Sequence, residues 1–271
     1  MRLLKLIISL HVFAYDCFKR IAFKVMGKRY SSAVVLYYHS VTREQRPAFA
    51  KQMDTLLKMA TPFFADVGRF PHCADNRQAA VTFDDGLQSV IENALPELKA
   101  RCIPVTLFVP SGCLGEPPSW IKDPDYRDQV EVVIPTAMLE LLKEDSLVHI
   151  GSHSVTHSNL LHLEDHEVRT EICQSKNDLE DIVDREIRGL SFPFGGFKSY
   201  HVTIAREAGY KRVFSISPTV VSCNSHFIVG RVLTDPSDSI LEFKLKICGA
   251  YRWQHLASHM KSKIRAVLSK A

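Results

Sequence analysis

Residues 79–86 read AAVTFDDG, an apolar run that ends in two acids and a glycine. The run Ala79–Phe83 is typical of a buried strand, and Asp84 and Asp85 follow it directly. Two carboxylates at the end of an apolar strand are costly to bury unless a cation pairs with them. Gly86 allows a sharp turn beside them. The stretch predicts a strand end that binds a divalent cation, with Mg²⁺ for phosphoryl transfer or a solvated turn as the alternatives.

Short strand-like and helical segments alternate on both sides of this stretch. The predicted strands are residues 33–38, 79–83, 105–109, 147–150, 189–192, 212–216 and 227–229, and the predicted helices are residues 47–60, 89–101, 135–144, 163–183 and 200–208. Strands that alternate with helices form parallel sheets with the helices outside. About seven such units favour an α/β fold of the (β/α) barrel type, whose chemistry lies at the carboxyl ends of the strands. Residues 111–130 are rich in Gly, Pro and Asp and predict an irregular insertion containing Trp120, which is expected to shape the site.

Two histidines follow the predicted strand 147–150 in the stretch GSHSVTH, residues 151–157. His153 and His157 are four residues apart, a spacing that places both imidazoles on one side of a helical turn, as in other His-x-x-x-His zinc pairs. Imidazole favours Zn²⁺, Ni²⁺, Cu²⁺ or Fe over Mg²⁺. Two histidines and one aspartate leave a coordination position open for water, and the other aspartate is then placed to accept a proton as water attacks a carbonyl. The two motifs together predict metal-assisted hydrolysis.

Three motifs resemble those of the metal-dependent polysaccharide deacetylases, also called NodB-homology or carbohydrate esterase family 4 domains. Residues 82–86 (TFDDG) resemble the first motif, residues 153–157 (HSVTH) the second and residues 192–195 (FPFG) the third. The resemblance runs from residues 36–39 (LYYH) to Arg231 and beyond. It implies a distorted (β/α) barrel, usually of seven strands, with one divalent transition metal of the Zn²⁺ type. It also implies hydrolysis of the N-acetyl group of an amino sugar.

The resemblance assigns roles to individual residues. It implies that Asp84 is the general base and that Asp85, His153 and His157 are the metal ligands. It implies as well that the backbone N–H of Phe194 helps to bind the oxyanion of the tetrahedral intermediate, a role that needs geometry rather than a particular side chain.

The sequence departs from the family pattern at two places. The third motif usually starts with an arginine that orients the catalytic aspartate, whereas Ser191 and Phe192 stand there, and the late Leu-x-Leu-His motif that supplies the general-acid histidine is missing. A branch of the family with a rearranged motif order has a Tyr-His pair on an early strand, like residues 38–39 here. This likeness predicts His39 as the acid that protonates the leaving amine, with a buried structural histidine as the alternative. Arg231 is a candidate to replace the missing arginine.

The chain has 271 residues, of which 46% are hydrophobic and 24% charged, as is ordinary for a globular domain. The net charge of +4 is unevenly distributed, because residues 1–29 carry seven basic side chains against Asp16 alone and residues 243–271 carry seven without an acid. Residues 1–30 predict a basic amphipathic helix. Its apolar face holds Leu3, Ile7, Leu10, Ala14, Cys17, Phe18, Ile21 and Val25, and its polar face Arg2, Lys5, Ser9, Asp16, Lys19 and Arg20.

This helix is expected to lie on an anionic membrane surface rather than to cross the membrane, because its apolar runs are far shorter than the roughly 20 residues that a spanning helix needs. Packing on the protein's own body or on a partner is the main alternative. A secretory signal is another, although no A-x-A cleavage pattern follows. The expected division of the chain is residues 1–30 as this candidate anchor, 31–250 as the barrel and 251–271 as a basic C-terminal helix.

Seven cysteines, an odd number without a C-x-x-C pair, favour a reduced protein. We therefore expect a cytoplasmic protein, peripheral at the inner face of the membrane, with a periplasmic protein on an uncleaved N-terminal anchor as the alternative. The expected function is removal of N-acetyl groups from a polysaccharide or a lipid-linked glycan in cell-surface polysaccharide biosynthesis or modification. Hydrolysis of another amide, such as a formamide or a cyclic amide, and a catalytically silent glycan-binding scaffold are the alternatives. No nucleic acid partner is expected, since no stacked aromatics accompany the basic ends.

Overall fold

The computed structural model describes residues 2–27, 32–67, 77–123, 127–220, 226–255 and 257. Its strands are β1 (Ser32–Tyr38), β2 (Thr61–Pro62), β3 (Arg77–Phe83), β4 (Val105–Val109), β5 (Val148–Ser152), β6 (Gly189–Ser191), β7 (Arg212–Ser215), β8 (Ile228–Gly230) and β9 (Val232–Leu233). Its α-helices are α1 (Arg2–Val25), α2 (Arg46–Met59), α3 (Leu95–Lys99), α4 (Thr136–Leu142), α5 (Asp165–Val183), α6 (Ser199–Glu207) and α7 (Ile240–Ile247). Shorter helical turns are Val90–Ala94, Ser111–Cys113, Arg127–Val130, Leu160–His162 and Pro193–Gly195.

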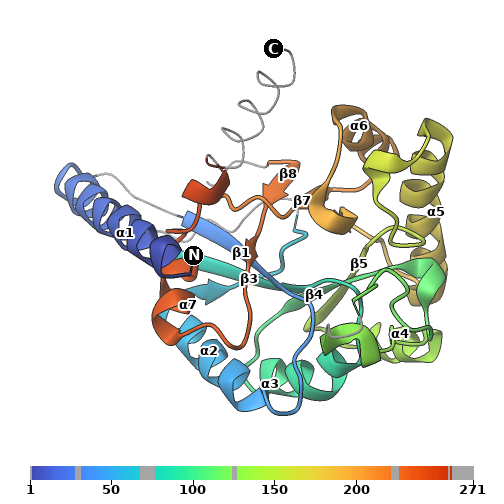
Figure 1. Ribbon diagram of the computed structural model, residues 1–271, viewed down its shortest axis with the longest axis horizontal. Coiled ribbons are helices and arrows are strands. Elements are labelled where there is room, and N and C mark those ends of the chain that lie inside the picture. Colours follow the sequence, from blue (N-terminus) through green and yellow to red (C-terminus); the bar gives the residue numbers. More distant parts are fainter. Residues whose placement is uncertain are drawn as a thin grey trace.

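Eight of these strands form one curved sheet in the order β8-β7-β6-β5-β4-β3-β1-β9, and β2 pairs with β3 outside this path. All the strand pairs are parallel. Only Arg231 separates β8 from β9, so one extended segment pairs first with β7 and then with β1. This segment nearly closes the sheet, and the helices lie around it (Figure 1). The predicted distorted (β/α) barrel is confirmed, with seven strands when β8 and β9 count as one and β2 is set apart.

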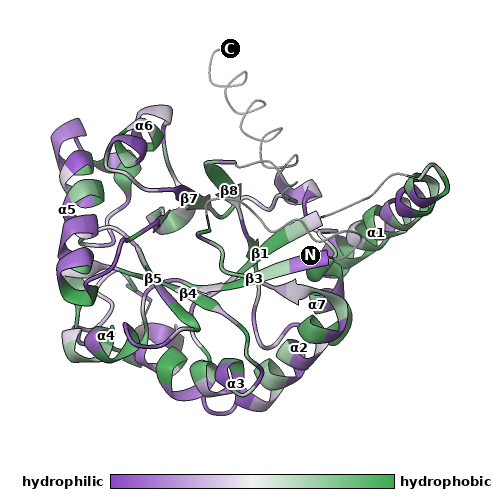
Figure 2. Cartoon of the chain, turned by 180° about the vertical axis from the view of Figure 1, so that it is seen from behind, coloured by the Kyte–Doolittle hydropathy of each residue, from purple (hydrophilic) through white to green (hydrophobic). Residues whose placement is uncertain are grey.

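The strands are buried on both faces, which explains why their sequences are apolar runs rather than alternating patterns. Every residue of β1 and of β4 is buried. The larger apolar cluster, which includes Leu36 and Phe83, lies between the sheet and the helices. A smaller cluster of alternate strand residues, including Val35, Phe108 and Phe214, fills the inside of the barrel. Seen from behind, the strands and the inner sides of the surrounding helices are largely hydrophobic (Figure 2).

The alternation of side chains along β3 determines which way the Asp84 side chain points. Ala80 belongs to the inner cluster, and the Thr82 hydroxyl accepts a hydrogen bond from Arg231 within the barrel. Asp84 is two residues further on, so its side chain points inward as well. Its backbone N–H donates to the Tyr38 carbonyl at 2.9 Å, which extends the pairing of β1 with β3 by one bond beyond the strand end.

The helix predicted over residues 89–101 differs in detail from the expectation. It begins as the π-helical turn Val90–Ala94 and continues as α3. Pro96 lies in the first turn of α3 and has no N–H to donate, so a regular α-helix cannot run through it unchanged. The predicted C-terminal helix over 251–271 lies outside the described residues, apart from 251–255 and 257.

Helix α1 extends from the barrel beside α7 (Figure 1). Within the described ranges, no helix combines the length and the apolar character that crossing a membrane requires.

Candidate active site

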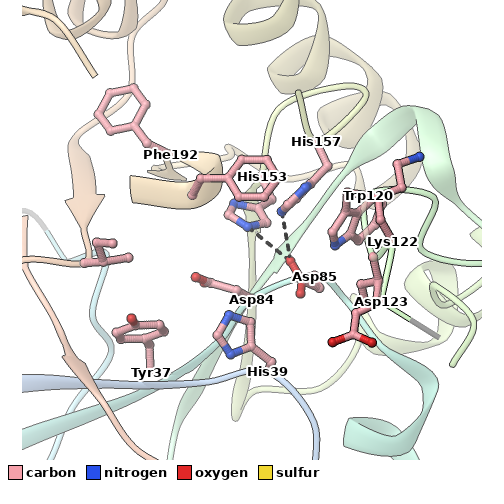
Figure 3. Close-up of a pocket in the computed structure, with 13 residues that line it drawn as sticks. Tyr37, His39, Asp84, Asp85, Trp120, Lys122, Asp123, His153, His157 and Phe192 are labelled. Carbon is pink, nitrogen blue, oxygen red and sulfur yellow. Dashed lines mark ion pairs between the residues drawn. The ribbon is translucent and has the colours of Figure 1, made fainter. Parts of the chain in front are cut away.

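A cavity of about 350 Å³ opens at the carboxyl ends of the strands, a volume within the range of ligand pockets. Its floor carries Asp84 and Asp85 after β3, His153 after β5, and His157 (Figure 3). The rest of the wall is formed by Tyr37, His39, Trp120, Ile121, Lys122, Asp123, Phe192, Phe194 and Ile216. The barrel thus brings the two sequence motifs, which are about 70 residues apart in the chain, to a single cavity.

Asp84 is held by a guanidinium group from the segment β8–β9, which is separated from β3 by β1. Arg231 donates from Nη1 to Asp84 Oδ1 and from Nη2 to Asp84 Oδ2, both at 2.6 Å, and the two side chains are almost fully buried. The same guanidinium donates to the Ser191 hydroxyl at 2.7 Å. Such a two-pronged contact fixes the plane of the carboxylate as well as its position.

The charge of Asp84 is set by opposing effects. Burial acts to raise the pKa of this carboxyl, but Arg231 and then His153 lower it by more, so the net pKa of Asp84 is below its usual value. Asp84 is therefore an ionised carboxylate, without a proton of its own, at neutral pH. A carboxylate in this state is able to accept a proton.

Asp85, His153 and His157 form a compact buried cluster. Asp85 Oδ1 lies 3.3 Å from His153 Nε2 and 3.1 Å from His157 Nε2, and all three side chains are buried. His153 Nδ1 lies 2.8 Å from the Ser191 carbonyl oxygen, which can only accept, so Nδ1 carries the hydrogen and Nε2 faces Asp85. A backbone carbonyl behind a histidine is a common support for a metal ligand.

The pKa values in the cluster are shifted in different directions. Burial acts to raise the pKa of Asp85, but hydrogen bonds from His153 and His157 bring it well below its usual value. Burial acts to lower the pKa of His153, but Asp84 and Asp85 raise it overall. Burial dominates at His157 and lowers its pKa. A metal ion requires both imidazoles to be neutral, so its binding competes with protonation, mainly at His153.

The donor atoms fit a transition-metal ion. One ligand atom from each of Asp85, His153 and His157 lies within 4.8 Å of the others. A tetrahedral Zn²⁺ with ligand bonds of about 2.0–2.1 Å needs ligand atoms roughly 3.3 Å apart, close to both distances from Asp85 Oδ1. One carboxylate and two imidazoles are also the donor set of catalytic sites that keep one position open. These three residues are able to hold one divalent ion.

The prediction that His153 and His157 share a helical turn is wrong. Residues 153–157 form an irregular loop in which Ser154 and His157 have left-handed backbone angles (φ 64° and 56°). Glu171 of α5 holds this loop, because its carboxylate accepts from the N–H groups of Val155 and Thr156, both at 2.9 Å. It also accepts from the Thr156 hydroxyl at 2.6 Å. The two imidazoles therefore converge through a folded loop rather than through helical spacing.

His39, Phe194 and Trp120 lie around the cluster. Figure 3 shows His39 beside Asp84 and Asp85, and its charge contributes to the lowered pKa values of both acids. Phe194 is 53% exposed at the rim with a left-handed backbone (φ 56°), and its ring lies 4.9 Å from that of His157. Trp120, from the predicted insertion, stacks on His157 at a ring separation of 4.1 Å.

Residues 72–213, more than half of the chain, match the sequence profile of the polysaccharide deacetylase family. The chain belongs to the polysaccharide deacetylase family. The resemblance seen in the three motifs is thereby confirmed.

This member of the family is similar to proteins of known name and to solved structures. It is 24% identical over 185 residues to the poly-beta-1,6-N-acetyl-D-glucosamine N-deacetylase of Staphylococcus aureus, a match that covers 68% of this chain but only 61% of the relative. IcaB from Ammonifex degensii superposes with a TM-score of 0.66 at 24% identity, over 82% of this chain and 98% of that one. The Streptococcus pyogenes deacetylase PplD gives a TM-score of 0.65 at 17% identity, over 80% and 98%. At these identities the two structures support the fold alone.

Positive φ angles gather at the candidate active site. Among the described residues other than glycine, six have a positive φ, and four of them lie at the cavity or in its supporting loop. These four are Asp85, Ser154, His157 and Phe194. Such conformations are uncommon, and they persist where surrounding contacts hold them. The strained positions coincide with residues that the sequence motifs single out.

Two supporting residues of the site have weak or no signals in the sequence. Arg231 was a candidate only because the usual arginine is missing, and its contact with Asp84 depends on the closure of the barrel by β8 and β9. Ser191, at the position of that arginine, hydrogen-bonds to the Arg231 guanidinium instead. Glu171 lies within an ordinary helical pattern, and only its contacts with residues 155–156 reveal its role.

Proposed function

We propose that this chain is a metal-dependent hydrolase that removes N-acetyl groups from amino sugars of a cell-surface polysaccharide. The observation that carries the proposal is the buried cluster of Asp85, His153 and His157 directly beside the ionised, arginine-held Asp84 in an open cavity. Membership of the polysaccharide deacetylase family supports it, as does the name of the Staphylococcus aureus relative. Zn²⁺ is the metal that we propose, because imidazole-rich tetrahedral sites favour it.

Each residue has a task in amide hydrolysis. The ion held by Asp85, His153 and His157 would supply Lewis-acid polarisation of the acetyl carbonyl and a more acidic water. Asp84 accepts the proton of the attacking water, whose oxygen forms the new bond to the acetyl carbon. The Phe194 N–H donates to the oxyanion. The C–N bond then breaks, the nitrogen takes up a proton, and acetate and a free amino sugar leave.

We propose His39 as the donor of that last proton. His39 lies on the same wall as Asp84 and Asp85, one residue after β1, and its ring is 5.6 Å from that of Tyr37. Exchange of His39 for Ala should lower the turnover of acetate release by roughly 10²–10⁴-fold, as is usual for loss of a general acid, while the bound metal is retained. The matched control is His226→Ala, because His226 is an exposed histidine that does not line the cavity. Turnover near that of the control would assign the proton donor to another group.

The proposed substrate is poly-β-1,6-linked N-acetylglucosamine, the polymer in the name of the Staphylococcus aureus relative, with a lipid-linked glycan as the second candidate. The test is an acetate-release assay on oligomers of this polymer, on β-1,4-linked N-acetylglucosamine oligomers and on single sugars. We expect the highest kcat/KM with the β-1,6-linked oligomers. Equal release from all substrates would reject the assignment of the polymer, and no release from any would reject the deacetylase function.

We also propose that the protein acts at an anionic membrane surface, peripherally at the cytoplasmic face, with the periplasmic face as the alternative. The basic residues at both ends of the chain support the membrane contact. The described cysteines, among them Cys102 and Cys113, are free, which supports a reducing compartment. Alkaline phosphatase and fluorescent-protein fusions at the C-terminus distinguish the faces, because the former is active outside the cytoplasm and the latter inside it.

A further inference from the structure

Helix α1 contacts the barrel through a mixed side and turns an apolar stripe away from it. The buried residues of α1 are Ser9 and Asp16, both polar, and Leu6, Val12 and Phe13 are partly buried against the core. The apolar positions predicted to form one face are exposed, with Leu3 68%, Phe18 72%, Ile21 64% and Val25 83% accessible. These exposed positions are not the side that α1 packs on its own protein. Packing on the body, one of the alternatives from the sequence, therefore accounts for the side that holds Ser9 and Asp16 and not for the exposed apolar stripe.

Three polar contacts set this orientation. Arg2 donates to Glu242 of α7 from Nε at 2.8 Å and from Nη2 at 2.7 Å. Ser9 accepts from Trp253 Nε1 at 3.0 Å. Asp16 accepts from both Nη atoms of Arg252, at 2.5 and 2.7 Å.

These anchor positions of α1, residues 2, 9 and 16, are seven residues apart and so lie in one stripe along the helix. Turning α1 about its axis to bury Phe18 and Ile21 would break all three contacts. It would also leave Asp16 without the arginine that neutralises it. Contacts of α1 with α7 and with the segment after it thus hold the apolar stripe outward.

The outward stripe carries no charge. It consists of Leu3, Leu4, Ile7, Leu10, Ala14, Phe18, Ile21 and Val25, all of them exposed. Figure 2 shows green, hydrophobic stretches along α1 that alternate with purple, hydrophilic ones. An exposed apolar stripe of this length, in which His11 is a polar residue, is unusual on a free protein surface and marks an interaction site.

The basic side chains of α1 indicate what binds to this stripe. Residues 2–25 contain five basic side chains, and the one acid, Asp16, pairs with Arg252. Lys5 and Lys24 are exposed on α1. A second copy of the chain would bring two such basic helices together, whereas anionic lipid headgroups offer the opposite charge. An in-plane helix with an apolar stripe and basic flanks is suited to the boundary between headgroups and acyl chains.

We propose that the outward stripe of α1 is a bilayer-docking surface, and that α1 lies in the plane of an anionic membrane while its anchors at Arg2, Ser9 and Asp16 hold the barrel against it. The inference deepens the proposed membrane location and rests on it, but it does not depend on the deacetylase activity. No α1 residue lines the cavity, so binding to membranes and catalysis can be measured separately.

The test is sedimentation of the full-length protein with vesicles of phosphatidylcholine and phosphatidylglycerol in a 3:1 ratio. Phe18→Ser combined with Ile21→Ser should lower the partition coefficient by roughly 100-fold, about tenfold for each apolar side chain withdrawn from the bilayer. The matched control is Leu141→Ser, because Leu141 on α4 is 70% exposed, like Phe18, but lies on another helix. The control should bind as the wild type does, and wild-type binding should weaken on vesicles of phosphatidylcholine alone.

Vesicle binding by the double variant equal to that of the control would overturn the proposal. So would a wild-type dimer, seen by analytical ultracentrifugation, that the double variant converts to monomers while neither protein binds vesicles, because a second copy would then occupy the stripe. Acetate release from a soluble oligomer should be the same in the double variant, the control and the wild type. Absence of release in all three, with vesicle binding as expected, would reject the proposed activity and leave the docking surface in place.

Discussion

Replacing Asp84 by Asn should reduce acetate release by roughly 10³-fold or more while the protein still binds its metal ion. Asn has the shape of Asp but cannot accept a proton from water at neutral pH, and loss of a general base is worth about 10²–10⁴-fold. The three candidate ligands, Asp85, His153 and His157, are unchanged, so metal content should stay at the wild-type level. Acetate release and metal content are both measured on the same protein preparation.

A matched control for this exchange is Asp54→Asn. Asp54 is an aspartate that also accepts from an arginine, Arg101 at 2.7 Å, but it is half exposed on α2 and far from the cavity in the fold. Its exchange should leave turnover within about twofold, because exposed ion pairs contribute little. If Asp84→Asn retained more than a tenth of the wild-type turnover, Asp84 would not be the general base.

Exchange of Arg231 for Met should damage both stability and activity. Asp84 would be left as a buried carboxylate without its guanidinium partner, and removal of one member of a buried ion pair destabilises a protein by about 3–5 kcal/mol. Turnover should fall as well, because Arg231 holds both carboxylate oxygens of Asp84. Urea denaturation in the presence of a chelator measures the free energy of unfolding without a contribution from metal.

The loss of stability in Arg231→Met should depend on pH. In the wild type the pKa of Asp84 lies below its unfolded value, so the ion pair stabilises the fold above pH 4 and is lost only in stronger acid. Burial is the largest effect on the pKa of Asp84 and acts to raise it, so we expect this pKa to rise once Arg231 is removed. The loss of unfolding free energy in the variant, relative to the wild type, should therefore be largest near neutral pH. This loss should become smaller towards pH 5 as Asp84 takes up a proton.

Arg231→Lys separates charge from geometry. Lysine keeps the positive charge but cannot donate to both oxygens in one plane, so stability should recover more than turnover does. If Arg231→Met lost the same unfolding free energy at pH 7 and at pH 5, the variant would be destabilised by lost packing rather than by the loss of a partner for Asp84.

The part of the site that follows from local sequence was predictable. Asp84 and Asp85 end an apolar strand and His153 follows another, and parallel strands of a barrel bring such ends together. The alternation of strand and helix periods likewise indicated the type of fold, whereas the family was indicated by the resemblance of the three motifs at residues 82–86, 153–157 and 192–195.

The features that the sequence did not predict depend on contacts between segments that are far apart in the chain. Arg231 reaches Asp84 because residues 228–233 pair with β7 and then with β1, and no local pattern encodes this change of partner. The spacing of His153 and His157 suggested a helical turn, but Glu171 of α5 binds the backbone of residues 155 and 156 and holds them in a loop instead. Helical periodicity likewise identified the two faces of α1 but not which face contacts the body, because that is decided by partners more than 200 residues away.

The central claim is that Asp85, His153 and His157 hold one divalent ion, and the most direct measurement is metal content per chain by mass spectrometry after dialysis against Zn²⁺ at pH 8. We predict one ion per chain for the wild type and for His226→Ala, none for Asp85→Ala, His153→Ala and His157→Ala, and release of the ion from the wild type at pH 5 as the His153 imidazole takes up a proton. A wild-type chain without an ion, or a full complement in any of the three ligand variants, would contradict the account.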